Sequence, residues 1–376
     1  MPDGTPYATV KFDEKIDMRS MVESIDVEDH DRAIDRATIV FDSASDVCKI
    51  IREQSKVQIS LGWTKENALI FEGVVAAVKA EARGRGQERV TVTAYDLSYL
   101  LKQNRSKDRH FASGKLSDAL KAILSDYPRI TVDPGNVAPD PDPPLAGRPW
   151  VKTAGTSDWD FIQEAADTWK ARAFVEVNNN QSQFYFVAEK KLLRGDVMGF
   201  LHYCPGGVGP LIEFKYQRIA SAASPVSSAT VDDPDTGKAV TSQASPPPPE
   251  SPLDVGSGAS SQLARAADIM ANSAGKPEDA RPRTVVSGLP SDPDWVAQQT
   301  RQDPTRILGF YGQGEAVGTI ALRAKGKVRI EGLPPWAEGD WYVHKVNHIY
   351  TRVAGAGDRS AEQDKSTFRT KFAVTR

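Results

Sequence analysis

Two of the five histidines have a spacing that binds zinc in some proteins. The five are His30, His110, His202, His344 and His348. His344 and His348 form an HxxxH pattern, which holds a metal ion when both residues lie on one face of a helix. The surrounding residues 341–350 (WYVHKVNHIY) alternate as in a strand, which separates the two side chains by about 13 Å at roughly 3.3 Å per residue. No glutamate follows His344, so the pattern predicts neither a metalloprotease nor another metal site.

Other residue types that carry out chemistry lack the neighbours they need. Cys48 and Cys204 are the two cysteines, and we expect reduced, buried thiols, with a disulfide between them as the alternative. His202 lies near Cys204, but no second ligand pair has zinc-site spacing. The sequence contains no GxSxG nucleophile elbow and no GxxxxGK[ST] phosphate loop, and the GQG of residues 312–314 precedes a predicted strand instead of opening a helix. We therefore predict no catalytic, cofactor-binding or metal-binding residues.

The charged residues do not point to a substrate. Fifty acidic residues supply many of the carboxylate pairs that a glycoside hydrolase requires, so their number does not discriminate. Asp158 and Asp160 lie at the start of a predicted helix, where the helix dipole accounts for them. The basic stretch 102–109 (KQNRSKDR) lacks interleaved aromatic residues, and we expect a solvated connector. A net charge of −3 and a pI near 6.0 do not predict sequence-independent binding to nucleic acid.

The elements that surround these residues are mostly strands. Alternating apolar residues predict strands at 57–61, 69–80 and 90–95, with a flexible turn at 84–86. Helical spacing predicts a helix at 116–124, and Pro128 stops it.

A second helix and a hairpin follow. Ser157 with Asp160 resembles a capping box at the start of the second helix. Residues 172–177 and 184–189 read as two strands joined by a hairpin loop. The sequence therefore predicts an α+β unit within β-rich sequence.

The region 221–260 has the composition of a linker or extended loop. It is rich in proline and serine, contains no aromatic residue, and includes four consecutive prolines at 246–249. Such a segment cannot bury enough apolar surface to offset its ordering entropy. A spacer is expected there, with an SH3-type ligand as the alternative. A short helix is predicted at 263–270, and strands return from residue 306.

A weak internal repeat links the two β-rich regions. KVQI at 56–59 has a counterpart in KVRI at 327–330, and VAAV at 75–78 in VHKV at 343–346. Each is followed by a final alternating strand, at 90–95 and at 368–374. The pattern predicts two related β-domains.

The sequence contains no targeting signal and no membrane-spanning segment. Its first residues have neither a basic region nor an apolar run, and no stretch is long and apolar enough to span a membrane. We therefore expect no membrane anchor and synthesis in a cytoplasm.

Five segments, in this order, resemble the late control protein D family of phage tail hubs, which is related to the N-terminal hub portion of VgrG proteins. They are LIFEGVVAAVKA (69–80), VTVTAYDLSYLLKQNRSKDRHF (90–111), KLSDALKAIL (115–124), TSDWDFIQEAADTWKARAFVE (156–176) and IEGLPPWAEGDWYVHKVNHIYT (330–351). The fourth is the strongest match. The sequence departs from the family in its proline-rich linker and between that linker and residue 306.

The resemblance implies an α+β, mainly β fold with two related antiparallel β-barrel-like hub domains and an α+β insertion between them. The implied divisions are residues 1–111 for the first hub domain (completed by about 200–220), 112–199 for the insertion, 221–260 for the linker and 261–376 for the second hub domain.

The implied function is that of a structural baseplate hub, not an enzyme. A homotrimer would join the hexameric tail tube to the central spike among other baseplate components, and DNA or an effector would pass through its lumen without specific binding. The spike is expected on a separate polypeptide. Assembly would occur in the host bacterial cytoplasm, and the final location would be a virion tail baseplate or an extracellular injection particle. The interface residues are not predicted.

Two other functions stay open from the sequence alone. One is a tail-associated peptidoglycan-degrading enzyme, and the other is an effector-carrier or adhesion module.

Overall fold

The computed structural model describes residues 4–14, 16–42, 44–83, 87–140, 142–146, 149–169, 171–207, 209–218, 227–232, 239–243, 283–286, 310–335, 337–352 and 366–376. The helix predicted at 263–270 and the prolines at 246–249 lie outside these residues. The described part is mainly β, as predicted. No helix in it is long and apolar enough to cross a membrane.

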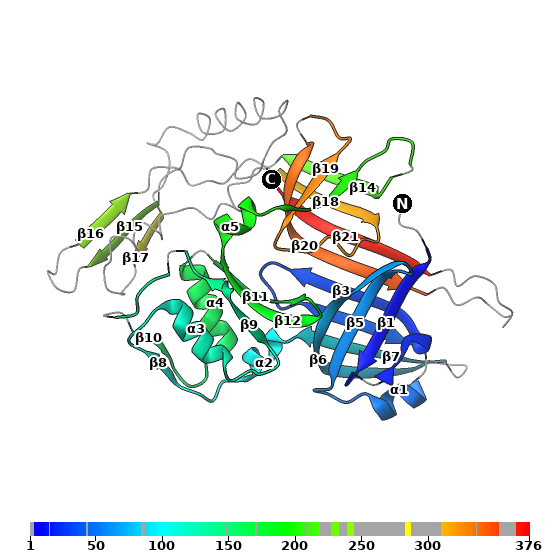
Figure 1. Ribbon diagram of the computed structural model, residues 1–376, viewed down its shortest axis with the longest axis horizontal. Helices are drawn as coiled ribbons and strands as arrows, with labels where there is room; N and C mark the ends of the chain where they lie inside the picture. Colours follow the sequence, from blue (N-terminus) through cyan, green and yellow to red (C-terminus); the bar gives the residue numbers. More distant parts are fainter. Residues whose placement is uncertain are drawn as a thin grey trace.

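A single large sheet of thirteen strands dominates the fold and curls into a half-barrel (Figure 1). Eleven of its strands follow the order β14 (Leu211–Arg218), β18 (Phe310–Val317), β21 (Thr367–Thr375), β20 (Gly339–Thr351), β3 (Val22–His30), β4 (Arg36–Phe41), β7 (Gln87–Asp96), β6 (Glu66–Arg83), β5 (Lys56–Trp63), β1 (Pro6–Phe12) and β2 (Ile16–Asp17). Beside this path, β19 (Lys327–Glu331) pairs with β20, and β13 (Val197–His202) pairs with β19. The β13–β19 pair is parallel, and the other pairs of this sheet are antiparallel.

Alternating burial explains the strands. In β5 the side chains of Val57, Ile59 and Leu61 are buried, whereas the residues between them are only partly so. This is the pattern of a strand with one face on a core. The strands predicted at 57–61, 69–80 and 90–95 are confirmed as parts of β5, β6 and β7.

The repeated sequence segments occupy equivalent places in two sets of five strands. The first set has the order β3-β4-β7-β6-β5 and the second the order β14-β18-β21-β20-β19. KVQI begins β5, and KVRI begins β19. The first lysine of each lies at the last pairing position with the long neighbouring strand, opposite Val74 in one set and Tyr342 in the other.

The two sets also share their irregularities. The pairing register shifts between Val75 and Ala77 on β6, and between Val343 and Lys345 on β20. These are equivalent positions of the repeat. A second shift, just after Val22 on β3, has its equivalent just after Leu211 on β14. Because bulges interrupt a ladder at defined positions and are conserved within families, two shared bulges indicate a common strand pattern.

A left-handed residue precedes β5 and β19 alike. Gln54 has φ +70° and Lys325 has φ +68°. Gln54 donates its amide N–H to the carbonyl of Val75 (2.8 Å), and Lys325 donates to that of Val343 (3.0 Å). The same backbone geometry therefore leads into both copies of the repeated segment.

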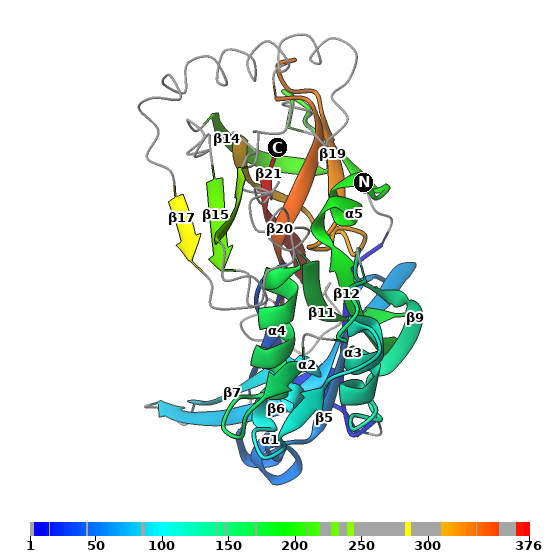
Figure 2. The same ribbon diagram turned by 90° about the vertical axis from the view of Figure 1, so that its left-hand side faces the viewer.

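The α+β unit lies against one side of the sheet (Figures 1 and 2). It contains α2 (Ser98–Gln103), β8 (Arg109–Phe111), α3 (Leu116–Leu124), β9 (Thr131–Ala138), β10 (Trp150–Lys152), α4 (Asp158–Thr168), β11 (Ala171–Asn178), β12 (Gln181–Ala188) and α5 (Glu189–Arg194). Both predicted helices and the predicted hairpin are confirmed by α3, α4 and β11–β12. Ser157 caps α4 by accepting from the Asp160 amide (3.0 Å).

Several smaller elements complete the described chain. They are η1 (Arg19–Met21), α1 (Ala44–Ile50), β15 (Ser227–Asp232), β16 (Ala239–Gln243) and β17 (Arg283–Val286). The last three form their own sheet. Two of them lie within 221–260, where composition predicted a linker or extended loop, because short runs such as SSATVD retain residues that favour strands.

Each part has its own apolar core. One core fills the first strand set around Ile39 and Ile59, another fills the α+β unit around Leu120 and Phe184, and a third lies among the C-terminal strands around Trp341. Because the three cores are separate, contacts between the parts of the molecule are needed to fix how these parts are placed relative to one another.

Candidate functional site

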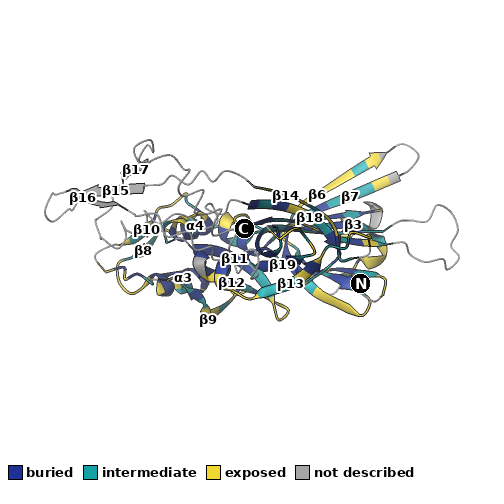
Figure 3. Cartoon of the chain, turned by 90° about the horizontal axis from the view of Figure 1, so that it is seen from above, coloured by how far each residue is buried: buried dark blue, intermediate teal, exposed yellow. Residues whose placement is uncertain are grey.

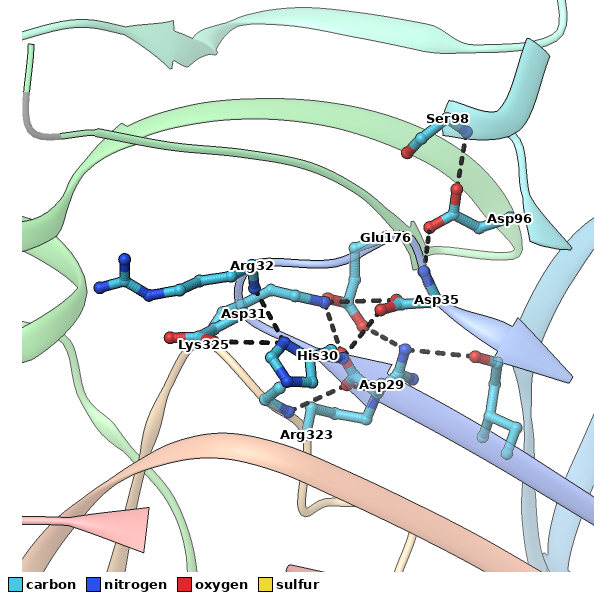
Figure 4. Close-up of polar contacts among 12 residues, drawn as sticks. Asp29, His30, Asp31, Arg32, Asp35, Asp96, Ser98, Glu176, Arg323 and Lys325 are labelled. Carbon is cyan, nitrogen blue, oxygen red and sulfur yellow. Dashed lines mark hydrogen bonds and ion pairs between the residues drawn. The ribbon is translucent and has the colours of Figure 1, made fainter. Parts of the chain in front are cut away.

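Buried and partly buried charged residues gather where the three parts of the molecule meet (Figure 4). We call this cluster the ionic junction and define it as Asp29, Asp35, Asp96, Glu176, Arg323 and Lys325. The first three come from the β3–β4 hairpin and the end of β7, Glu176 comes from β11 of the α+β unit, and the two cations precede β19. The junction therefore contains a residue from each part.

Lys325 lies at the centre of the junction. Its Nζ is 2.5 Å from Asp29 Oδ1 and 3.3 Å from both Asp35 Oδ2 and Glu176 Oε2. It also lies 5.0 Å from the centroid of the Phe174 ring, a cation–π distance. Burial lowers the pKa of this ammonium group, but the surrounding carboxylates outweigh burial and raise it well above its ordinary value. The surrounding carboxylates therefore stabilise the charged form of this lysine.

Asp29 and Arg323 add further contacts to the junction. Asp29 Oδ2 accepts from the Ala324 amide (2.9 Å) and from Arg323 Nε (3.2 Å). Arg323 also pairs with Glu176 and donates to the Ile70 carbonyl (3.2 Å). Burial opposes the charge of Asp29, but Lys325 and Arg323 overcome it and hold the pKa of this carboxyl below its ordinary value.

The pKa values of Asp35 and Asp96 are raised, whereas that of Asp29 is lowered. Burial raises the pKa of Asp96 to about 6, and burial together with neighbouring carboxylates raises that of Asp35 well above its ordinary value. The Asp35 amide donates to Asp96 Oδ2 (3.0 Å), and the Ser98 amide donates to Asp96 Oδ1 (2.7 Å). Two cations thus face four carboxyl groups, and the raised pKa of Asp35 and Asp96 reduces the negative charge that these four groups place around the cations.

A small recess lies beside Asp35, Asp96 and Glu176. Carboxyl groups in a recess are candidates for a catalytic acid and base. A glycosidase places one protonated and one ionised carboxyl group on either side of its substrate. At the junction the oxygens of Asp35 accept from the His30 amide (2.8 Å) and from Lys325, and both oxygens of Asp96 accept from backbone amides. These groups are occupied by internal donors, which favours a structural tie between segments over catalysis.

The two histidines of the HxxxH pattern lie on strand β20, as predicted, and have separate partners. His344 Nδ1 is 3.0 Å from Asp31 Oδ2, and its Nε2 is 2.8 Å from Thr375 Oγ1. His348 is buried, and its Nδ1 is 3.2 Å from Thr370 Oγ1. Burial lowers the pKa of His348 to about 3, so this ring is neutral. Among the described residues, no group of three or more His, Cys, Asp or Glu side chains is placed to hold a metal ion.

A second ionic cluster holds the start of α4. Asp158 is fully buried and lies 2.9 Å from Lys152 Nζ and 2.6 Å from an Arg109 nitrogen. Its Oδ2 also accepts from the Tyr127 hydroxyl (2.5 Å). Burial works against the charge, but these donors lower the pKa of Asp158 below its ordinary value. Ion pairs, more than the helix dipole, therefore account for this carboxylate.

The basic stretch 102–109 is not a solvated connector throughout, which corrects the sequence interpretation. The Arg109 side chain is only 10% exposed because it bonds Asp158 and Asp126. Lys107 is about half exposed and pairs with Asp126 (2.9 Å). Sequence composition identified the positive charges but not their partners, which lie up to 49 positions away.

The remaining candidates lie apart from both clusters. Cys48 and Cys204 are free thiols, as predicted, but the expectation that they are buried is wrong. Cys48 is exposed and Cys204 is partly exposed, and helix α1 buries Val47 in place of Cys48. The glycines of residues 312–314 lie inside strand β18, not before a strand. A Cβ on Gly312 would come within 2.5 Å of the Phe214 ring, so these glycines make room for aromatic side chains.

Sequence reasoning missed the ionic junction because its members are far apart, up to 296 positions for Asp29 and Lys325. One signal was available. The hairpin DHDRAID (29–35) places three acidic residues between two strands with buried faces. Acidic residues in such a place require cations from elsewhere.

No protein-family model and no curated protein matches the sequence. Solved structures do match over nearly the whole chain. The tail protein from Neisseria meningitidis MC58 matches with a TM-score of 0.64 at 10% identity, over 99% of this chain and 96% of its own. The 43 kDa tail protein of prophage MuSo2 from Shewanella oneidensis matches with a TM-score of 0.60 at 10% identity, over 99% and 98%.

A chain of the lidless PdpA–VgrG complex matches with a TM-score of 0.58 at 10% identity, over 98% of this chain and 64% of its own. At these identities the similarity concerns the fold. Over its whole length the chain has the fold of phage tail proteins, and the predicted resemblance is confirmed at that level.

Proposed function

We propose that the chain is a non-enzymatic hub subunit of a contractile tail or injection machine. Three copies would form a ring that joins the hexameric tail tube to the central spike and surrounds part of the delivery channel. DNA or an effector would pass through this channel without specific binding, and other baseplate components would contact the outside. The location would be the virion tail baseplate or an extracellular injection particle.

The observation that carries the proposal is the repeated five-strand pattern. Both sets share strand order, two bulges and a left-handed residue before the repeated segment. Three chains with two such units each supply six similar units in a ring. A sixfold tube can then seat on one face while the assembly keeps threefold symmetry for a spike.

The proposal divides the chain as the repeat suggests. Residues 1–111 would form the first hub domain, completed by about 200–220, and residues 112–199 the insertion. Residues 221–260 would form a linker that includes β15 and β16, and residues 261–376 the second hub domain. The fold shared with tail proteins and with a chain of the PdpA–VgrG complex supports the proposed hub function.

Oligomeric state and tube binding test the proposal. Light scattering of the full chain at micromolar concentration should give three times the protomer mass of 41.0 kDa, and electron microscopy should reveal a ring. The tube and spike proteins of the same machine should bind opposite faces of it. A stable monomer that neither protein assembles would contradict the proposal. Peptidoglycan zymography tests the enzyme alternative, and a cleared band that is lost in acidic-residue variants would replace the hub function.

A further inference from the structure

The two strand sets are joined inside the chain by strand pairing. Strand β20 extends past the end of β19, and β3 pairs with this extension from Lys345 opposite His30 to Thr351 opposite Ser24. The far half of β20 therefore has β21 on one side and β3 on the other. This join makes one continuous sheet from two sets.

Strand β6, the equivalent of β20 in the first set, has the same extension. Its pairing with β5 ends at Val74, whereas its pairing with β7 continues to Arg83. In the part of the chain that the structure describes, no strand pairs with the other side of β6 over residues 77–83. Figure 3 shows the β6–β7 hairpin projecting from the sheet with exposed residues along it. The first set therefore offers the edge that β3 covers in the second.

Strand β14 is the equivalent of β3 in the second set. It forms the end of the sheet that lies farthest from β2 in the strand order. It pairs with β18 over its length, and within the described residues no strand continues the sheet beyond residues 213–217. Ile212, at its bulge, is one of the few large apolar side chains of the described residues that is exposed (42%). An open strand edge with an exposed apolar residue beside it is a template for pairing with another chain.

We infer that β14 of one protomer pairs antiparallel with the β6 extension of the next, in the register that β3 adopts on β20. The inference rests on the proposed trimer and names the surface that closes it. The repeat fixes the register. Asn347 lies opposite Glu28, and Ile349 opposite Asp26. The equivalent pairs are Lys79 opposite Gln217 and Glu81 opposite Lys215.

Charge and size agree with this register. Glu81 and Lys215 carry opposite charges. Within the single chain Glu81 lies 2.6 Å from Lys79, and the exposed Lys215 lies 2.9 Å from Glu213. Directly opposite ions stabilise an antiparallel pair.

On the other face the same register sets small residues against rings. It places Ala80 opposite Tyr216 and Ala82 opposite Phe214. The two rings stack on each other, with centroids 5.4 Å apart. Alanines leave room for such rings across a strand pair.

The pairing is head-to-tail, so it closes a ring only if successive rotations sum to a full turn. Each junction between protomers would repeat the junction that β20 and β3 form within the chain. Six equivalent junctions, three within chains and three between them, then relate six similar units. The same geometry therefore accounts for an assembly of three chains whose six strand sets are arranged with nearly sixfold symmetry.

Cysteine pairing tests the register directly. Cys48 and Cys204 are first replaced by serine, and the full chain then carries Glu81→Cys with Lys215→Cys. Six strands lie between β14 and β6 in the sheet order of one chain, so a disulfide between these positions must join two protomers. Mild oxidation should give a covalent trimer on a non-reducing gel. The control pair Lys11→Cys with Lys215→Cys, with Lys11 exposed on β1, should stay unlinked.

Charge reversal gives an independent readout. Lys215→Glu should raise the protomer concentration at half-dissociation by about tenfold or more, because it places a carboxylate opposite Glu81. Adding Glu81→Lys should restore assembly, and Lys11→Glu should leave it unchanged. A trimer by light scattering that neither cross-links nor responds to Lys215→Glu would overturn the strand pairing and leave the proposed hub intact. A parent protein that is monomeric with every tube and spike partner would overturn both.

Discussion

Lys325 pairs with three carboxylates at a buried position, so its removal should lower the free energy of unfolding. It contacts Asp29, Asp35 and Glu176 and is almost fully buried. Lys325→Met leaves buried carboxylates without their cation, so we expect the free energy of unfolding to fall by about 3–5 kcal/mol. Urea unfolding measures this loss. Lys102→Met, at an exposed ion pair with Asp160, is the control and should cost less than about 1 kcal/mol. A loss of similar size in both variants would contradict the central role of Lys325.

Asp96 and His348 should make opposite contributions to stability as pH changes. Burial raises the pKa of Asp96 from 3.8 to about 6, so the folded state holds a proton that the unfolded chain has lost. Its contribution is complete below about pH 4 and is lost as pH rises through about 6. Burial lowers the pKa of His348 from 6.5 to about 3. Its contribution is complete above about pH 6.5 and is lost as pH falls towards 3.

The Asp96→Asn variant separates the two contributions. Without the Asp96 carboxyl, the free energy of unfolding should rise more steeply between about pH 4 and pH 6 than it does in the parent, because the falling contribution is gone. Urea unfolding of both proteins across this range gives the two slopes. Parallel profiles would mean that Asp96 does not titrate in this window. The variant also loses one of the two oxygens that accept from the Asp35 and Ser98 amides, which lowers the curve at every pH.

At the scale of an element, helix α4 offers two aspartates in one turn with different surroundings. Asp158 is fully buried against Arg109 and Lys152, whereas the Asp160 side chain is 49% exposed. Asp158→Asn should lower the free energy of unfolding by about 3–5 kcal/mol because two buried cations lose their counter-charge. Asp160→Asn should cost about 1 kcal/mol or less, as expected for the first turn of a helix. Thermal unfolding compares the two variants, and equal losses would contradict the anchoring of α4 by ion pairs.

Local pattern was sufficient to predict most elements around the site. Helix α3 follows from the spacing of Leu116, Leu120 and Leu124, and the cap of α4 follows from Ser157. These features depend on neighbours within a few residues. The partners of Arg109 do not, since Asp158 is 49 positions away. Hydrophobic periodicity carries no information on which distant charges meet, so the basic stretch was predicted as solvated.

At the scale of the molecule, sequence similarity identified the repeated segments but not the join between them. KVQI and KVRI indicated equivalent strands, and the shared bulges extend that equivalence to five strands in each set. The pairing of β20 with β3 could not be predicted, because it depends on the edge that each strand leaves open once its neighbours are placed. The ionic junction lies beside this join, and its members come from all three parts of the chain.

The proposed ring couples the stability of the whole molecule to its concentration. If β14 pairs with β6 of the next protomer, unfolding also separates three chains, and each tenfold rise in concentration should add about 0.9 kcal/mol per protomer, two thirds of the 1.4 kcal/mol per decade of a simple association. The unfolding temperature of the parent should therefore rise with concentration. For Lys215→Glu the rise should begin at a concentration about tenfold or more higher, and below it the unfolding temperature should equal that of the dissociated parent, because Lys215 is 75% exposed in the single chain. Asp158→Asn should instead lower the unfolding temperature at every concentration and keep the parent's dependence. Calorimetry over a hundredfold range separates these cases, and a concentration-independent parent would exclude a ring held by this edge.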